Sequence, residues 1–327
     1  MTTPFKKLGA SFDGLAIRGA RGLRTAAVLA LAAALLLSLA GCGSANSAKK
    51  DTGNATTSSL TVQTAVWANQ LVAGDNKTIT VGSDTTFPPF ESVDKDGKTV
   101  IGFDVDIMTA MADTMGLKVN YKTYDWDGII PGLNAGNDFD MICSALTITP
   151  ERAKVIYFSS PYFVDSYGMA VPSNSTLADW KQLKAGDTVG VQLGSSGADW
   201  CKKNLPAGIK YFENKDTSAL FQAMQGGEVK CIIQDYSTTS NFCATPVRQA
   251  KMAQRISGVG VDSYLGMGFQ KSDKGSAMRD DFNKALQTIV DNGTYAKIYA
   301  KYFSGTPDFI PGSMTFDEAL AKSTPGN

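Results

Sequence analysis

The chain has 327 residues, of which 43% are hydrophobic, with 31 basic and 31 acidic side chains and no histidine. The lack of histidine excludes Ser-His-Asp and Cys-His catalysis and removes the commonest zinc ligand. Its five cysteines form no CxxC pair, so we expect neither a metal nor a cofactor.

The N-terminal segment 1–41 has the order of an export signal. An uncharged apolar run at 25–40 leads into LAGC, which ends at Cys42. Five basic residues precede that run: Lys6, Lys7, Arg18, Arg21 and Arg24. The run has about 16 residues, whereas a spanning helix needs roughly 20. LAGC resembles a bacterial lipobox, which implies that Cys42 carries lipid and holds an extracytoplasmic protein on the cell membrane. A stop-transfer anchor, or a cysteine placed there by chance, is the alternative.

Removal of 1–41 leaves a mature chain with 26 basic and 30 acidic residues, a net charge of about −4. No basic stripe survives, so we expect no nucleic-acid partner. Residues 43–59 are small and polar, and we interpret 42–76 as a tether to the lipid. Within it, residues 60–74 fit either a short helix or an extended arm.

From residue 77 onward, short strand patterns alternate with helix patterns, which is typical of an α/β fold. The first half predicts strands at 78–84, 118–124 and 139–146. Helices are predicted within 102–116 and 128–136, and each ends at a glycine.

The second half repeats this order. A strand at 187–196 runs into a Gly/Ser turn, a helix at 218–227 ends in two glycines, and a strand at 229–236 precedes a helix at 237–243. The segments GIIPGLNAGNDFDMICSAL and SALFQAMQGGEVKCIIQDY both run from an apolar helix through a glycine stop to a strand with a polar end. We interpret them as parts of two related lobes. Open α/β sheets bind ligands at the carboxyl ends of strands, which predicts a cleft between the lobes.

Four motifs carry a family resemblance: SDTTFPPFE, GFDVDIMTAMADTMGLKV, YDWDGIIPGLNAGNDFDMICSALTITPERAKVIYFSSPYF and NGTYAKIYAKYF. Over about residues 77–305 the chain resembles the polar amino-acid solute-binding proteins of ABC importers, the family 3 extracellular receptors that include the glutamine-binding protein. The resemblance implies a two-lobed, periplasmic-binding-protein-like (type II) α/β fold, with mixed sheets, flanking helices and two hinge strands. The first lobe would comprise 77–165 plus 265–327, and the second 166–263.

The same resemblance implies the ligand site. Arg152 would pair with the α-carboxylate of an amino acid, since a guanidinium donates two parallel N–H bonds to a planar carboxylate. Asp235 would take the α-ammonium group. The complete set of expected ligand-binding residues is Asp84, Phe87, Trp126, Ser144, Ala145, Thr147, Arg152, Gln192, Ser195, Ser196, Gln234 and Asp235. The alternatives are a surface ion pair for Arg152, an N-cap for Asp235, and ordinary core positions for Phe87 and Trp126.

Two positions depart from the family pattern and bear on the ligand. Ala145 stands where the family usually has glycine, and Gln192 where some relatives have lysine. Together with Asp84 and Gln234, Gln192 would read the ligand side chain. One acid and two amides suit an amide or a basic group better than a carboxylate. Glutamine is therefore favoured, with arginine, histidine and cystine left open.

The expected function is that of a monomeric lipoprotein receptor, not an enzyme, which closes on a polar L-amino acid and delivers it to an ABC permease. One alternative is a secreted cyclohexadienyl/arogenate dehydratase-like enzyme on the same fold, which needs no histidine. Another is a sensor that feeds no permease.

Four cysteines remain after Cys42, and their spacing permits three pairings. We expect a disulfide between Cys201 and Cys243, and buried strand thiols at Cys143 and Cys231. A disulfide is compatible with an extracytoplasmic location.

Overall fold

The computed structural model describes residues 77–245, 249–258 and 261–323, which belong to one compact unit. The predicted signal segment, Cys42 and the tether lie outside these residues. Within the described ranges, no helix has the length and apolar character needed to cross a membrane.

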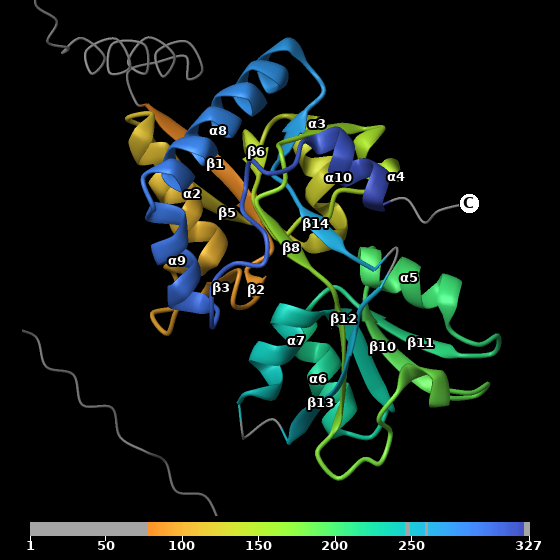
Figure 1. The fold of residues 1–327 in the computed structure, drawn as a ribbon. Coiled ribbons are helices and arrows are strands. Elements are labelled where there is room, and N and C mark those ends of the chain that lie inside the picture. The colour runs from red at the N-terminus through yellow and green to blue at the C-terminus, as the bar shows by residue number, and fades with distance from the viewer. Residues whose placement is uncertain (1–76, 246–248, 259–260, 324–327) are drawn as a thin grey trace, which may run out of the picture. The chain divides into compact units, whose positions relative to one another are not determined.

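The first sheet has five strands in mixed orientation (Figure 1). Its spatial order is β5 (Lys118–Thr123), β1 (Thr78–Ser83), β6 (Met141–Ile142), β15 (Gly268–Gln270) and β7 (Ile156–Phe158). β1 runs parallel to both β5 and β6, whereas β15 runs antiparallel to β6 and β7. We call the part of the chain built on this sheet the first lobe.

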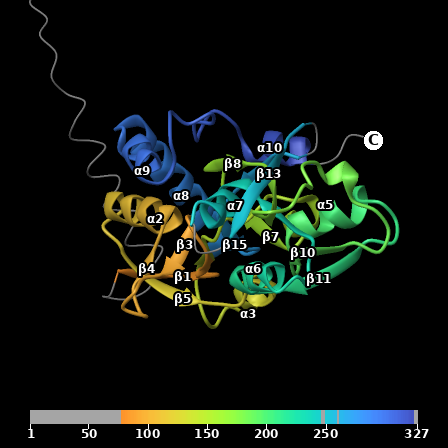
Figure 2. The ribbon, with the colours of Figure 1, turned by 90° about the horizontal axis from the view of Figure 1, so that it is seen from below.

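Helices cover both faces of the first sheet. Their bounds are α2 (Phe103–Thr114), α3 (Ile129–Ala135), α4 (Pro150–Ala153), α8 (Asp273–Asp291), α9 (Thr294–Tyr302) and α10 (Phe316–Ser323), with a 3-10 turn at Trp126–Gly128. Figure 2 shows α2, α8 and α9 together on one side of the lobe, and these three helices pack against one another. A small antiparallel sheet lies beside α2 and contains β2 (Thr86–Phe87), β3 (Glu91–Val93) and β4 (Val100–Ile101).

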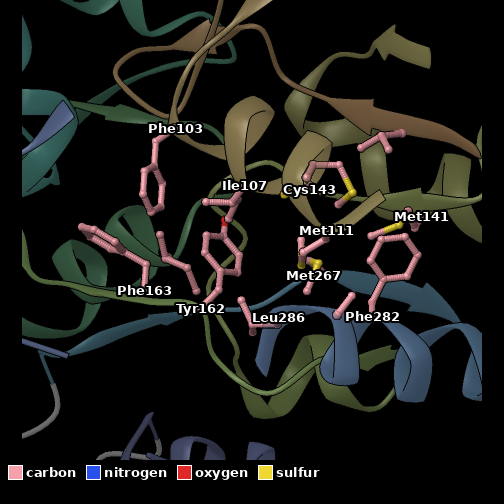
Figure 3. Close-up of a cluster of buried hydrophobic side chains, with 14 of the residues drawn as sticks. Phe103, Ile107, Met111, Met141, Cys143, Tyr162, Phe163, Met267, Phe282 and Leu286 are labelled. Atoms are coloured by element: carbon pink, nitrogen blue, oxygen red, sulfur yellow. The ribbon is translucent and has the colours of Figure 1, made fainter. Parts of the chain in front are cut away.

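The main core of the first lobe fills the space between its sheet and the helices α2 and α8. Figure 3 shows Met111 and Ile107 of α2 on one side and Phe282 and Leu286 of α8 on the other, with Tyr162 standing between them. The sheet contributes alternate residues of its strands to this core. Met141 of β6 faces the core, whereas its neighbour Ile142 faces α3.

The second lobe is built on another five-stranded mixed sheet. Its order is β11 (Lys210–Asn214), β10 (Thr188–Gln192), β12 (Cys231–Asp235), β9 (Tyr167–Pro172) and β13 (Ala250–Ile256). A 3-10 turn at Trp180–Gln182 and three helices flank it: α5 (Ser196–Asn204), α6 (Thr217–Gln225) and α7 (Tyr236–Cys243). Two antiparallel strands, β8 (Phe163–Asp165) and β14 (Ser263–Leu265), carry the chain between the two sheets (Figure 1). The predicted two-lobed fold with mixed sheets and two hinge strands is confirmed.

One predicted strand is shorter than expected. The apolar run at 139–146 forms a strand only at Met141–Ile142. The chain then bends, and Ala145 adopts a left-handed backbone with φ of 42°. Because this bend ends the ladder, the following residues form a loop at the carboxyl edge of the sheet.

The predicted Cys201–Cys243 disulfide is wrong, because all four cysteines after Cys42 are free thiols. Cys201 of α5 packs into the core on one face of the second sheet, whereas Cys243 at the end of α7 packs against the core on the opposite face. The sheet separates the two sulfur atoms. Cys143 and Cys231 are buried, as expected, but only Cys231 lies in a strand, because β6 ends at Ile142.

Candidate functional site

The candidate site is assembled from the carboxyl ends of four strands. Asp84 directly follows β1, Ser144 follows β6, Gln192 ends β10, and Asp235 ends β12. Sheets that end facing each other in this way bring polar groups from both lobes together. The sequence pattern predicted strands with polar ends, and the family resemblance implied these four residues.

Nine of the twelve predicted residues line one small cavity. They are Phe87, Trp126, Ser144, Ala145, Thr147, Gln192, Ser195, Ser196 and Asp235. The first five belong to the first lobe and the last four to the second. The cavity wall is therefore shared between the lobes.

Arg152 lies beside this cavity on a helix held by its own N-cap. The Thr149 side chain accepts a 3.2 Å hydrogen bond from Arg152 N, and Pro150 occupies the first helical position. The half-buried guanidinium donates from Nη1 to Thr147 O at 2.9 Å and from Nη2 to Gly194 O at 3.2 Å. It also lies 5.2 Å from the ring centre of Trp126.

The surroundings of Arg152 differ from those of a surface ion pair. None of the ion pairs among the described residues includes Arg152. The residue lines a second, wider cavity, whose wall includes Trp126 and Ser196 of the first cavity. Burial lowers the pKa of Arg152, while the nearby Asp235 charge acts in the opposite direction. An arginine still remains charged at neutral pH.

Asp235 presents a carboxyl group without a hydrogen-bond donor in the described part of the chain. The residue is 9% exposed and occupies the N-cap position of α7, yet its side chain makes no capping bond. Burial raises its pKa well above the ordinary value, and the charge of Asp165 adds to this effect. Arg152 lowers the same pKa, which places its cation within electrostatic range of Asp235.

Asp84 and Gln192 bond to each other across the lobes. Gln192 Nε2 donates to Asp84 Oδ2 at 2.9 Å, and the Thr86 N–H and hydroxyl groups donate to Asp84 Oδ1. Burial nevertheless raises the pKa of Asp84 to about 6. These two side chains form a polar end of the site next to the cavity.

Gln234 does not line the cavity. It is 2% exposed, and neither heteroatom of its side-chain amide has a hydrogen-bond partner among the described residues. Successive side chains of a strand point to opposite faces, so the neighbour of the cavity-lining Asp235 is directed away from the cavity. Gln234 and Asp235 are adjacent polar residues, so the sequence alone could not show that only Asp235 reaches the cavity.

Further polar contacts join the lobes around the cavity. Ser196 Oγ donates to Thr147 Oγ1 at 3.0 Å, and Arg152 bonds to Gly194. Lys215 of the second lobe forms an ion pair with Asp125 of the first. The structure is therefore a closed form.

Two further residues contribute, and sequence reasoning identified only one of them, Gly194, while it missed Ser263. Ser263 at the start of β14 shares a 2.8 Å hydrogen bond with Thr147 Oγ1, and the Gly194 carbonyl accepts from Arg152. Gly194 lies in the predicted Gly/Ser turn and has a φ of 71°, so that turn was the available signal. Ser263 carries no local signal, because its role depends on the hinge crossing.

Comparisons with known proteins agree with this fold. A family model described as bacterial extracellular solute-binding proteins, family 3, matches residues 79–305. A probable histidine-binding protein of Neisseria gonorrhoeae is 32% identical over 71% of this chain and 85% of its own length. An arginine-binding extracellular protein of Bacillus subtilis is 29% identical over 85% of this chain and 97% of its own length.

Solved structures show the same similarity. An ancestral arginine-binding protein bound to glutamine is 35% identical, with a TM-score of 0.65 over 71% of this chain and all of its own. An ancestral amino-acid-binding protein, described as a precursor of cyclohexadienyl dehydratase, is 30% identical, with a TM-score of 0.63 over 70% of this chain and 96% of its own.

Proposed function

Because the chain belongs to the family 3 bacterial extracellular solute-binding proteins, we propose that it is a receptor for a polar L-amino acid, which it delivers to an ABC importer. The observation that carries the proposal is the pairing of an acidic and a basic side chain around one small cavity, which Asp235 lines and Arg152 adjoins. Arg152 lies on the first lobe and Asp235 on the second, within electrostatic range of each other. A zwitterion presents one group of each sign.

In this proposal Arg152 receives the α-carboxylate. The guanidinium has five N–H donors, and its two described hydrogen bonds go to backbone carbonyls. Asp235 receives the α-ammonium group, since its buried carboxyl lacks a donor in the described chain. Phe87 and Trp126 exclude water and thereby strengthen both contacts.

Charge balance limits the side chain of the amino acid. Asp84 and Asp235 outnumber Arg152, and the polar end of the site contains Asp84 with Gln192. A ligand carboxylate there would be repelled by Asp84. We therefore propose an amide or basic side chain, with glutamine and arginine as the first ligands to test.

The proposed mechanism is lobe closure without covalent chemistry. The amino acid first binds the first lobe through Arg152, Thr147 and Phe87. Ser195, Ser196 and Asp235 of the second lobe reach it only when the lobes close. Contacts made in the closed form alone shift the equilibrium toward closure.

The proposed location is the outer side of the cell membrane. This part rests on the basic and apolar segment before Cys42 and on the lipobox-like LAGC. The polar stretch at 43–59 would let the lobes reach a permease.

Isothermal calorimetry on the protein from about residue 60 tests the proposal. One site should bind glutamine or arginine, and glutamate should bind far more weakly. Arg152→Ala should abolish binding, and Arg152→Lys should weaken it at least about tenfold, since an ammonium group cannot bond in the bidentate manner. If Arg152→Ala binds like the unchanged protein, the assignment of the carboxylate site is refuted.

The enzymatic alternative has one observation in its favour, the raised pKa of the Asp235 carboxyl, which a general acid requires. Incubation with prephenate or arogenate followed by mass spectrometry distinguishes the two functions. We expect no turnover under conditions in which an amino acid binds. Coupling to a permease, as opposed to sensing alone, would appear as amino-acid uptake that depends on this protein.

A further inference from the structure

Two buried carboxyl groups lie directly behind the cavity wall of the first lobe. Glu91, the first residue of β3, is 0% exposed, and Asp104, in the first turn of α2, is 1% exposed. Neither has a lysine or arginine among its described partners. Burial of two unpaired carboxylates is costly, so donors or a proton must compensate.

Glu91 connects to the site through a serine. Ser144 Oγ donates to Glu91 Oε1 at 2.8 Å and accepts from Asp84 N at 2.8 Å. Ser144 lines the cavity, and Asp84 bonds to Gln192 across the lobes. The orientation of the Ser144 hydroxyl therefore depends on Glu91.

Asp104 holds the neighbouring backbone. Its Oδ2 accepts from Ala145 N at 2.8 Å and from the Tyr162 hydroxyl at 2.7 Å. Figure 3 shows Tyr162 inside the core with its hydroxyl directed toward α2. Ala145 lines the cavity with a left-handed φ of 42°, a conformation that an L-residue adopts reluctantly. The bond to Asp104 helps to keep it there.

The remaining oxygens of the pair complement each other. Glu91 Oε2 and Asp104 Oδ1 are buried and have no donor in the part of the chain that the structure describes, and the two carboxyl groups lie within hydrogen-bonding reach of each other. Two carboxylates only accept, whereas one added proton supplies a donor that satisfies both oxygens. Because Asp104 already has two donors and Glu91 has one, a proton on Glu91 Oε2 that is donated to Asp104 Oδ1 would complete the hydrogen bonding of both groups.

The surroundings favour retention of this proton. The titratable groups that interact most strongly with the pair include Asp84, Tyr121, Cys143, Tyr162 and Tyr295, none of which is cationic. Burial and the charge of Asp104 raise the pKa of Glu91 well above its ordinary value, and burial raises that of Asp104 to about 6. Both shifts oppose the simultaneous ionisation of the two groups.

We propose that Glu91 and Asp104 hold one proton between them and that this protonated pair positions Ser144 and Ala145 to receive the amino acid. The inference rests on the proposed function and adds two positioning residues that lie outside the cavity wall. Loss of the proton at alkaline pH places two anions side by side. They then separate, and the cavity wall held by Ser144 and Ala145 loosens.

Substitutions of Glu91 test the binding consequence with L-glutamine and L-arginine as ligands. Glu91→Gln supplies a neutral amide that donates to Asp104 and accepts from Ser144, so its affinity at pH 6 should stay within about threefold of the original. It should also remove the decline in affinity between neutral and alkaline pH. Glu91→Ala removes both bonds and should bind at least about tenfold more weakly at every pH.

Two measurements on the protein without ligand test the proton itself. The infrared difference between the original protein and Glu91→Gln at neutral pH should contain the C=O stretch of a protonated carboxyl group. The melting temperature of the original protein should fall more steeply with rising pH than that of Glu91→Gln. The reason is that a raised pKa means that the folded state retains a proton that the unfolded chain has lost. Asp281→Asn, a buried acid paired with Lys284 away from the cavity, should change neither result relative to the original.

Each outcome bears on one hypothesis. If neither amino acid binds the original protein, the proposed function fails while the infrared and melting results still decide the shared proton. Absence of the protonated C=O signal overturns the proton, and equal affinities of Glu91→Ala and Glu91→Gln overturn the positioning role.

Discussion

At the scale of single residues, burial and partners decide what each charged side chain does. Asp235 occupies a capping position, but it leaves the helix uncapped and presents its carboxyl to the cavity. Arg152 stands next to Glu151 in the chain, but it bonds to carbonyls on both lobes. In both cases the ordinary structural role is absent, and the side chain is available for a ligand.

Ligand binding should release protons through Asp235. Its pKa is raised well above normal in the free protein, and the ammonium group of an amino acid would lower it again. Up to about one proton per ligand should be released at pH 6, and the number should fall as the pH rises and free Asp235 ionises. Calorimetry in buffers of different ionisation enthalpy measures this number. Asp235→Asn should bind weakly and release none, and the absence of release from the original protein would contradict the role of Asp235.

At the scale of elements, the repeated segments occupy matching places. β6 and β12 are each the third strand of their sheets and each follow a helix, α3 or α6. Their registers match Gly82 with Ile142 and Gly190 with Ile232. Counting two residues onward from each glycine makes Asp84 and Gln192 equivalent positions, and these two side chains bond to each other.

Comparison of β6 with β12 shows which feature the sequence pattern did not predict. Both strands were predicted as apolar runs with polar ends. β6 nevertheless stops at Ile142, whereas β12 continues to Asp235. The bend after β6 depends on the hydrogen bond from Ala145 to Asp104, a residue 41 positions earlier. Local periodicity contains no information on such a contact.

The short helix α4 depends on its cap, and the cap affects Arg152. Thr149→Ala should lower the free energy of unfolding by about 1 kcal/mol and weaken amino-acid binding, because it removes the acceptor for Arg152 N. Thr149→Ser retains the hydroxyl, so its free energy of unfolding and its affinity for the amino acid should both stay close to those of the original protein. Urea unfolding and calorimetry provide the two values, and an unchanged Thr149→Ala protein would show that the cap contributes nothing.

At the scale of the whole molecule, closure depends on contacts that neither lobe can make alone. Two hydrogen bonds join the lobes at the cavity edge. Gln192 donates to Asp84, and Ser196 donates to Thr147, so at most one partner in each bond carries a charge. Lys215 with Asp125 is an exposed ion pair farther out, which we expect to contribute little. The inner contacts should therefore control the stability of the closed form.

Gln192→Ala should accelerate release of the amino acid more than it slows association. The side chain acts only after closure, so its loss destabilises the closed form and leaves the first encounter with the first lobe intact. Stopped-flow fluorescence would separate the two rates. Lys215→Ala is the matched control from the same lobe and should change neither rate appreciably. A slower association with an unchanged release rate in Gln192→Ala would contradict this order of events.

The sequence by itself determined the α/β order, the glycine-terminated helices, the polar ends of the strands and the motifs that place the chain in its family, because these features depend on neighbours along the chain. Only the tertiary structure decided which side of a strand each residue occupies and which distant groups meet. It turned Gln234 away from the cavity beside Asp235, and it placed Cys201 and Cys243 on opposite faces of a sheet. It also brought Glu91 and Asp104 together behind the cavity wall. Burial and long-range packing govern these outcomes, and residue spacing along the chain does not encode them.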